Sequence, residues 1–521
     1  MSTPALAPQR PRTRVSWLRV LLVLVCTVAV SWGGYRTVST AVTQLDEPDP
    51  AVFAAYVDVT AWPPYPFETP SGPEEANVIL SFVVADPEQA CAPSWGGYYS
   101  LDEAASEIEL DRRVSQLRLT GGQARVSFGG QLGTELGTAC TDTADLVEAY
   151  QEVIDRYELT SIDLDLEGPT LQDVEGAERR AAAIQQIQEE AAAADEPLAV
   201  WLTLPVAPTG LTAEGLGAVT TMLAAGVDVA GVNGMTMDFN VVTSESAPLS
   251  DVVVEASKAL HGQVRTAFAD AGQSLSENDA WAKVGITPMI GQSDFADEVF
   301  TVEDAEVVNQ FAQDVAVGQV AMWSLNRDST CTAPLPTVLT VVQTSCSGID
   351  QRASRFAEVL SADLASRPAV AAPESEPSES PAVVPAPIPG QAGEVVDDPE
   401  TSPFPVWDPL GTYPGGTKIV WQKQVYQAKY WTSGVTPGSA GAGGDAPWTL
   451  VGPVLPGDTP APLPTLPEGT YPAWDPEEPY TAGTRVLLDG VPYEAKWWSQ
   501  GQEPGTPVQG GSPWVLILPG A

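Results

Sequence analysis

The chain has 521 residues and a formal net charge of −44 at pH 7, because 24 Lys and Arg residues stand against 68 Asp and Glu residues. This length allows one large domain with smaller additions, and such an excess of negative charge argues against binding to nucleic acid or to anionic membrane surfaces. The only histidine, His261, lies in a helical pattern as a surface or packing residue, so we expect chemistry by carboxylates, hydroxyls and aromatic rings, with no metal ion and no cofactor.

The N-terminus combines a basic stretch, residues 1–14, with an apolar run over residues 15–35. A basic start before an apolar core is typical of an export signal. The run also reaches the length of about 20 residues that spans a bilayer. A cleaved signal peptide and an uncleaved anchor, with its basic end in the cytoplasm, remain two alternatives. Both predict an extracellular protein, either secreted or tethered to the outer face of the cell membrane.

From about residue 51, strand-like runs alternate with helical patterns. The strand-like runs are 53–60, 78–85, 124–129, 161–167, 199–204, 231–238, 284–291 and 319–324. The clearest helical patterns are 142–157, 174–194, 213–225, 250–271, 302–317 and 351–362. This alternation predicts an α/β fold over residues 51–366, a (β/α)8 TIM barrel, with an open doubly wound sheet as the alternative. No Gly-rich dinucleotide motif follows the first strand, which disfavours a Rossmann fold.

Four cysteines lie beyond the apolar run, which itself contains Cys26. No two of them have the CxxC spacing of a metal site. An even number in an exported chain predicts two disulfide bonds. We expect the pairs Cys91–Cys140 and Cys331–Cys346, although the sequence does not determine the connectivity.

Residues 160–169 read Thr-Ser-Ile-Asp-Leu-Asp-Leu-Glu-Gly-Pro. Asp163, Asp165 and Glu167 alternate with large aliphatic residues, which predicts a strand with its acids on one face. Asp165 and Glu167 would lie about 6–7 Å apart, with Glu167 at the carboxyl end, where α/β barrels carry their chemistry. Crowded carboxylates retain a proton near neutral pH, as cleavage of a glycosidic bond requires. Taken alone, the stretch also fits an exposed, acidic edge strand.

Two similar units follow Pro-rich segments near the C-terminus. A linker rich in Pro, Ala, Glu and Ser covers residues 367–405, and a second one covers 456–469. The units 406–455 and 470–519 repeat their aromatic residues at an offset of 67 and predict two small all-β modules. The candidate binding residues are Trp407, Tyr430, Trp431, Trp474, Trp497 and Trp498.

The rings of Trp431 and Trp498 are expected to be exposed, while Tyr430 and Trp497 are expected in the module cores, with the reverse assignment left open. Exposed, rigid rings stack on sugar faces. An aromatic core or a protein-binding patch is the alternative.

The acidic stretch resembles the Asp-x-x-Asp-x-Asp-x-Glu signature of family 18 glycoside hydrolases, the chitinase family. Asp163, Asp165 and Glu167 match its last three acids, and Thr160 stands in place of the first. Residues 127–130, Ser-Phe-Gly-Gly, match the Ser-x-Gly-Gly motif of the same family.

Two further motifs appear in the family order. Residues 235–238, Met-Thr-Met-Asp, look like the Met-x-Tyr-Asp motif, with Met237 in place of the tyrosine. Trp323 matches the tryptophan that forms the floor of the sugar subsite. The C-terminal units are similar to chitin-binding modules of carbohydrate-binding families 5 and 12. The four motifs together span most of residues 51–366.

The resemblance implies retaining hydrolysis assisted by the N-acetyl group of the substrate. Glu167 would be the general acid and base, Asp165 would orient the acetamide, and Asp163 would share a proton with Asp165. Thr160 is expected to weaken this charge coupling, and Met237 removes a hydroxyl donor. The implied or candidate substrate-binding residues are Asp238, Trp323, Met237, Gln292, Tyr56 and Asp58. For Ser127, Asp238 and Trp323, packing inside the barrel is the alternative.

These observations predict a monomeric chitinase whose partner is chitin or a related N-acetylglucosamine polysaccharide. An endo-β-N-acetylglucosaminidase acting on glycoprotein or wall glycans shares the same acids and is one alternative. A non-catalytic chitin-binding lectin on the same barrel is another, although the presence of Glu167 argues against it.

Overall fold

The computed structural model describes residues 51–244, 246–364, 397–399, 401–439, 446–460, 462–505 and 512–518. The N-terminal unit, Met1–Asp49, lies outside these ranges, and with it the predicted signal or anchor. Most of the predicted linker 367–405 lies outside them as well. Within the described ranges, no helix combines the length and the apolar character needed to cross a membrane.

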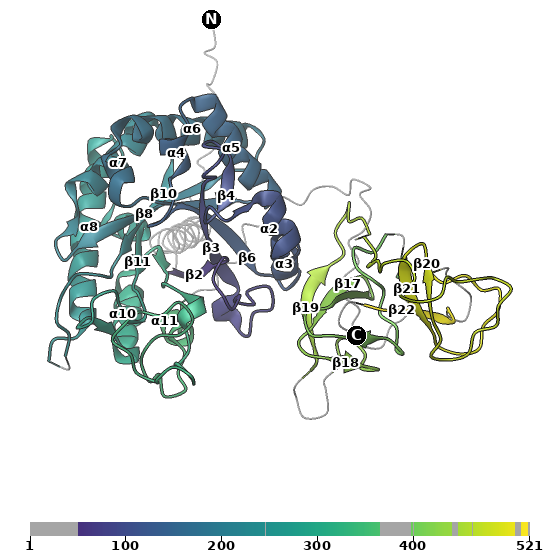
Figure 1. Ribbon diagram of the computed structural model, residues 1–521. Helices are drawn as coiled ribbons and strands as arrows, with labels where there is room; N and C mark the ends of the chain where they lie inside the picture. Colours follow the sequence, from purple (N-terminus) through teal and green to yellow (C-terminus); the bar gives the residue numbers. More distant parts are fainter. Residues whose placement is uncertain are drawn as a thin grey trace, which may run out of the picture. The chain divides into compact units, whose positions relative to one another are not determined.

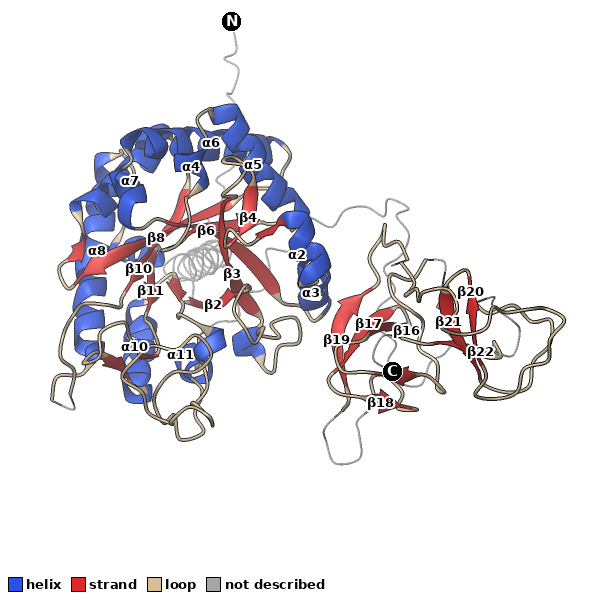
Figure 2. Cartoon of the chain, in the orientation of Figure 1, coloured by secondary structure: helices blue, strands red, loops and turns tan. Residues whose placement is uncertain are grey.

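Residues 51–364 form an α/β region in which helices surround a set of strands (Figures 1 and 2). Its strands are β1 (Val52–Phe53), β2 (Ala55–Asp58), β3 (Asn77–Ala85), β4 (Pro93–Trp95), β5 (Tyr99–Ser100), β6 (Gln123–Gly129), β7 (Ser161–Asp165), β8 (Ala199–Ala207), β9 (Gly210–Leu211), β10 (Val229–Met235), β11 (Val284–Thr287), β12 (Gly291–Gln292), β13 (Val299–Phe300) and β14 (Gln319–Val320).

The helices of this region are α2 (Leu101–Glu107), α3 (Leu110–Leu119), α4 (Leu136–Ala139), α5 (Thr143–Arg156), α6 (Val174–Ala193), α7 (Ala213–Ala225), α8 (Leu249–Asp270), α9 (Glu277–Ala282), α10 (Val302–Val315) and α11 (Phe356–Ser361). Three short 3₁₀ helices are η1 (Pro73–Glu75), η2 (Gly168–Gln172) and η3 (Leu325–Arg327).

The parallel strands follow the order β1-β14-β11-β10-β8-β7-β6-β3, and the antiparallel strands β4 and β5 extend the row beyond β3. The chain passes from β1 to β2 through a single residue, Ala54. Because β1 pairs with β14 and β2 pairs with β3, segment 52–58 contacts strands at both ends of the parallel row. The region therefore has the barrel-type α/β architecture that the alternating pattern predicts.

Local sequence determines where several helices begin and end. Ser100 and Glu103 form a capping box at α2, and Thr301 and Asp304 form another at α10, so side chains satisfy the first free backbone N–H groups. Helix α7 ends at Gly226, whose φ of 89° is readily accessible only without a Cβ atom. Each cap fixes the point at which the chain turns back toward the strands.

Several predicted elements have other ends in the structure. The predicted strand 161–167 ends at Asp165, although the backbone N–H of Leu166 still donates to Thr203. The predicted strand 284–291 ends before Pro288, which has no N–H to donate. The predicted helix 351–362 begins only at Phe356. Helices α2, α3, α4 and α9 are additional to the clearest predicted patterns.

Both predicted disulfide bonds are confirmed. Cys91 pairs with Cys140, with their Cα atoms 4.8 Å apart, and Cys331 pairs with Cys346, with a Cα separation of 5.1 Å. His261 is buried in α8 and stacks on Trp281 with ring centroids 4.1 Å apart, so it is a packing residue.

The C-terminal part contains two small antiparallel sheets. The first sheet comprises β16 (Lys418–Trp421), β17 (Gln424–Ala428) and β19 (Trp448–Pro453), with β15 (Thr412–Tyr413) and β18 (Thr432–Ser433) forming a separate pair. The second comprises β20 (Arg485–Leu488), β21 (Val491–Ala495) and β22 (Trp514–Leu516). Both are all-β, as predicted.

Candidate active site

Strand β7 separates aliphatic from acidic side chains, as its alternation predicts. Ile162 and Leu164 are fully buried in the large apolar core between strands and helices. Asp163 and Asp165 point to the opposite face and are 1% and 4% exposed. Glu167 lies two residues beyond Asp165 in extended backbone and is only partly buried. The acids thus form a row that becomes more exposed toward the end of the strand.

Asp163 accepts hydrogen bonds from three hydroxyl groups on three different strands. Tyr56 of β2 donates at 2.9 Å and Ser127 of β6 donates at 2.7 Å, both to Oδ2. Thr203 of β8 donates to Oδ1 at 2.6 Å. Since all these contacts are donated to the carboxylate, the hydrogen bonds favour its ionised form, whereas burial raises its pKa above the ordinary value.

The hydrogen bond of Asp165 is directed to Glu167, whereas the family resemblance implies a proton shared with Asp163. Burial raises the pKa of Asp165 well above its ordinary value, and the charges of Glu167 and Asp163 raise it further. Burial also raises the pKa of Glu167, as does the charge of Asp238, while the hydrogen bond from Asp165 lowers it. Asp165 and Glu167 therefore retain a proton as a coupled pair.

Asp238 lies just after β10 and faces this pair across the strand ends. Its backbone has a positive φ of 54°, and its carboxylate accepts the backbone N–H of Asp294 at 3.3 Å. Burial raises the pKa of Asp238, and the charge of Asp294 adds to this effect. The neighbouring Met237 is half-buried. A protonated Asp238 is consequently able to donate a hydrogen bond.

An aromatic cluster lies beside the acids. Trp323 stacks on Phe82 with ring centroids 5.4 Å apart, and its ring lies 5.9 Å from that of Tyr56. Trp323 lies beyond the end of β14 and is bridged to Met289, so it extends the strand without belonging to it. Tyr56 belongs to this cluster and also donates to Asp163, which links the rings to the row of acids.

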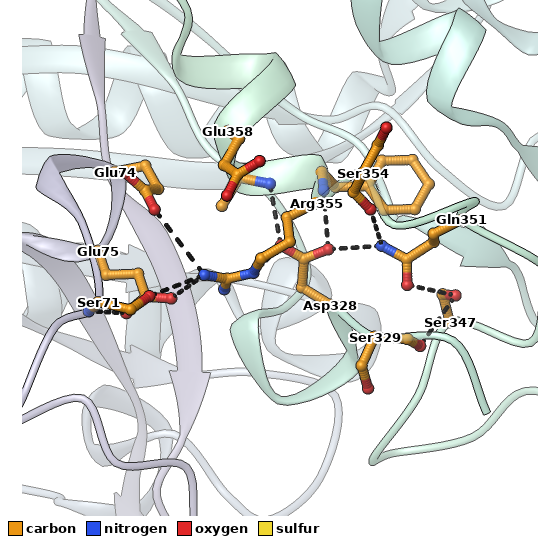
Figure 3. Close-up of polar contacts among 12 residues, drawn as sticks. Ser71, Glu74, Glu75, Asp328, Ser329, Ser347, Gln351, Ser354, Arg355 and Glu358 are labelled. Atoms are coloured by element: carbon orange, nitrogen blue, oxygen red, sulfur yellow. Dashed lines mark hydrogen bonds and ion pairs between the residues drawn. The ribbon is translucent and has the colours of Figure 1, made fainter. Parts of the chain in front are cut away.

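The segment after Trp323 is fixed by a polar network (Figure 3). Asp328 accepts the backbone N–H groups of Phe356 and Ala357 at 2.8 and 3.0 Å, and thereby caps α11. Arg355 lies between Asp328 and Glu75 and pairs with both carboxylates. This network joins η1 to the start of α11 and holds the chain just beyond Trp323.

The side chains of two candidate binding residues form hydrogen bonds within their own loops. Gln292 is buried, and its amide nitrogen donates to the backbone oxygens of Ser293, Phe295 and Glu298. Asp58 accepts the backbone N–H and the hydroxyl of Thr60 at 2.9 and 2.7 Å. Both side chains shape the strand ends around the acids.

Sequence reasoning did not identify Phe82, Thr203 or Asn233. Thr203 and Asn233 are single polar residues inside otherwise apolar strands, β8 and β10. That contrast is the signal which marks them, because a buried polar side chain requires a partner. Phe82 carries no such signal, since an aromatic residue in a predicted strand fits any core.

The two C-terminal sheets have matching aromatic cores. Tyr413 packs edge-on against Trp448 at 5.2 Å, and Tyr480 packs in the same way against Trp514 at 5.1 Å. Trp407 and Trp474 are partly buried against these cores.

The four remaining candidate rings of these sheets are all exposed. The exposed fractions are 45% for Tyr430, 60% for Trp431, 41% for Trp497 and 61% for Trp498. The expectation that Tyr430 and Trp497 occupy the cores was wrong. Each pair follows the last residue of a strand, where the alternation of inward and outward side chains ends.

No group of three or more His, Cys, Asp or Glu side chains in the described ranges is arranged to hold a metal ion.

Comparison with known proteins gives one family match and several relatives. The model of carbohydrate-binding module family 5/12 matches residues 473–515. The chain is 34% identical over 260 residues to a probable bifunctional chitinase/lysozyme of Escherichia coli, covering 48% of this chain and 28% of that protein. It is 32% identical over 304 residues to endochitinase 11 of Metarhizium anisopliae, covering 56% of this chain and 54% of that protein.

Among solved structures, the catalytic domain of a hyperthermophilic chitinase from Pyrococcus furiosus is 28% identical, with a TM-score of 0.49. That match covers 60% of this chain and 95% of the solved domain. The chain spans about a quarter and about half of the two curated relatives, at 28% and 54% of their lengths. Residues 473–515 thus form a module of carbohydrate-binding family 5/12, and the α/β region before them is related to chitinases, in agreement with the family 18 motifs.

Proposed function

We propose that this protein is an extracellular chitinase that hydrolyses β-1,4-linked N-acetylglucosamine polymers with retention of configuration. The observation that carries the proposal is the proton-holding pair of Asp165 and Glu167 at the end of β7, beside the aromatic cluster of Trp323. Similarity to two chitinases over about half of the chain supports it.

In the proposed reaction, the acetamide oxygen of the substrate attacks the anomeric carbon while the glycosidic C–O bond breaks. The proton that Asp165 shares with Glu167 moves to Glu167 and from there to the departing oxygen. Asp165, now a carboxylate, accepts the acetamide N–H and stabilises the positive charge of the oxazolinium intermediate. Water then attacks the anomeric carbon and gives one proton to Glu167. This step opens the oxazolinium ring and restores the acetamide. Asp238 fixes the sugar by a hydrogen bond, and Trp323 supports its apolar face.

The proposed organisation places a closed (β/α)8 barrel over residues 51–366 and chitin-binding modules over 406–455 and 470–519. The equivalent pairs Tyr413–Trp448 and Tyr480–Trp514 support two modules, although the family model matches only the second. Exposed rings next to each sheet are suited to stacking on sugars. Residues 15–35 would direct export and either be removed or tether the protein to the outer face of the membrane.

The test is release of soluble oligosaccharides from colloidal chitin by the full chain and by its Glu167→Gln variant. The amide preserves the shape of the side chain but has no acidic proton, so turnover should fall about 10²–10⁴-fold while binding to chitin persists. Glu175→Gln, at an exposed position in the first turn of α6, is the matched control and should retain wild-type activity. Wild-type turnover by a folded Glu167→Gln variant would refute the assigned role.

A further inference from the structure

A continuous series of hydrogen bonds crosses four neighbouring strands and ends on Asp163. On β11, the hydroxyl of Thr287 donates to Asn233 Oδ1 at 2.8 Å. On β10, Asn233 Nδ2 donates to Thr203 Oγ1 at 3.0 Å and to the hydroxyl of Tyr56 at 3.4 Å. Thr203 on β8 donates in turn to Asp163 on β7 at 2.6 Å. All five side chains are buried, so water does not substitute for these contacts.

The proton count gives this series a direction. Each hydroxyl group has one proton, and both Tyr56 and Thr203 donate theirs to Asp163, although their oxygens lie only 3.0 Å apart. The amide of Asn233 has two N–H groups and supplies one to each of these oxygens. Thr287 donates to the amide oxygen, which fixes the orientation of the amide. Every proton in the series therefore points toward Asp163.

We propose that Thr203 and Asn233 are positioning residues that hold Asp163 as an anion, and so keep the reacting proton on the Asp165–Glu167 pair. The inference rests on the proposed function of that pair. Thr203 acts on Asp163 directly, and Asn233 acts by satisfying the oxygens of Thr203 and Tyr56. Neither residue is required to touch the substrate.

Two opposing effects act on Asp163. Burial raises its pKa above the ordinary value, and the bonds from Thr203 and Ser127, the charge of Arg125 and the bond from Tyr56 offset only part of this rise. The negative charge of Asp163 in turn raises the pKa of Asp165. The other charged neighbours on this side are Glu167, on the segment after β7, and Asp238, on the segment after β10, which faces Glu167.

Loss of a donor has a predictable effect on pH dependence. Without Thr203 or a correctly oriented Asn233, the pKa of Asp163 rises, and Asp163 takes up a proton at a higher pH than before. Its neutralisation removes negative charge beside Asp165, so the Asp165–Glu167 pair loses its proton at a lower pH. The basic limb of the kcat profile should therefore move toward lower pH.

The experiment measures kcat and KM against pH for the full chain with a soluble chromogenic chitooligosaccharide. Thr203→Val should lower kcat about 10-fold, leave KM within about 2-fold and shift the basic limb down by about one pH unit. Thr203→Ser restores the hydroxyl group. It should restore most of kcat and return the basic limb of the pH profile to its wild-type position. Asn233→Leu should shift the limb in the same direction, and Thr287→Val should shift it less.

Ser257→Ala is the matched control, since its buried hydroxyl bonds only within α8, to Val253 at 2.7 Å, and its loss should leave the profile in place. A merely structural role would lower thermal stability without moving the limb. If folded Thr203→Val, Asn233→Leu and Thr287→Val variants all show an unshifted limb, the inference is wrong. Failure of the proposed function gives a different result, because wild-type protein would then not turn over the substrate or Glu167→Gln would remain active.

Discussion

The buried ion pair of Glu135 and Arg180 offers a sharp test of how the site is supported. Both side chains are 1% exposed, and Arg180 donates to Glu135 Oε2 through Nη2 at 2.5 Å and through Nε at 2.9 Å. Glu135 also accepts the hydroxyl of Tyr150 and the backbone N–H of Gly137. This carboxylate follows β6 and lies next to Gly129, whose loop contacts Asp165.

Glu135→Gln should lower the free energy of unfolding by about 3–5 kcal/mol, because it leaves the guanidinium of Arg180 buried without a counter-charge. The exposed pair of Arg265 and Glu277 provides the control, with side chains 52% and 60% exposed. Glu277→Gln should cost at most about 1 kcal/mol, since solvent screens that pair. The double substitution Glu135→Gln with Arg180→Met should recover part of the loss, because it removes the unpaired charge.

The pH dependence gives an independent check. Burial raises the pKa of Glu135, but the charge of Arg180 and the hydrogen bonds outweigh it, so the net pKa is lowered. A carboxylate with a lowered folded-state pKa contributes stability above its unfolded pKa, and this stability is lost as pH falls through the folded value. The difference between wild type and Glu135→Gln should therefore shrink as the pH is lowered from 7 to below about 4.

The assay is denaturant unfolding of the full chain followed by far-ultraviolet circular dichroism. The α-helices of residues 51–364 contribute to this signal, so their unfolding is followed by its loss. The reasoning is refuted if Glu135→Gln costs no more than Glu277→Gln at pH 7, or if its cost does not change with pH.

Two further predictions concern the strand end and the modules. Gly129→Ala should reduce kcat at least about 10-fold, because the φ of Gly129 is 105° and a Cβ atom would lie 2.0 Å from the backbone oxygen of Asp165. Kinetics on a soluble oligosaccharide test this prediction, and a near-normal kcat would contradict it. Replacing Trp431 and Trp498 together by Ala should weaken sedimentation with insoluble chitin about 10-fold or more, with turnover of soluble oligosaccharides unchanged. Leu410→Ala, at a position 56% exposed, is the control for the module surface, and equal binding by both variants would refute the assignment.

The elements around the acids were predictable because their patterns are local. Period-two alternation in residues 161–167 predicted both the strand and the facing of Asp163 and Asp165. The even number of cysteines beyond the apolar run predicted the two disulfide bonds. Trp323 was identified by its match to the family motif, and it lies three residues beyond the end of β14.

Contacts between distant strands were not predictable in this way. Thr203 reaches Asp163, and Asn233 reaches Thr203, only because β10, β8 and β7 are adjacent; the two hydrogen bonds join residues 40 and 30 positions apart. The exposure of the Tyr430 and Trp497 rings was not predicted for a related reason. Alternation applies within a strand, and both residues lie just past the end of one, where backbone bends decide the direction of the ring.

The strand end also explains why three acids of similar chemistry are suited to different tasks. Asp163 lies deepest, and its three hydroxyl donors offset part of the rise in pKa that burial causes. Asp165 is nearly as buried, but its Oδ1 has no hydrogen-bond partner and its bond goes to another acid, so it favours the protonated form. Glu167 lies beyond the last strand residue and is the most exposed of the three. The hydroxyl donors around Asp163, which Asp165 lacks, therefore favour the retained proton on the Asp165–Glu167 pair at the end of the strand.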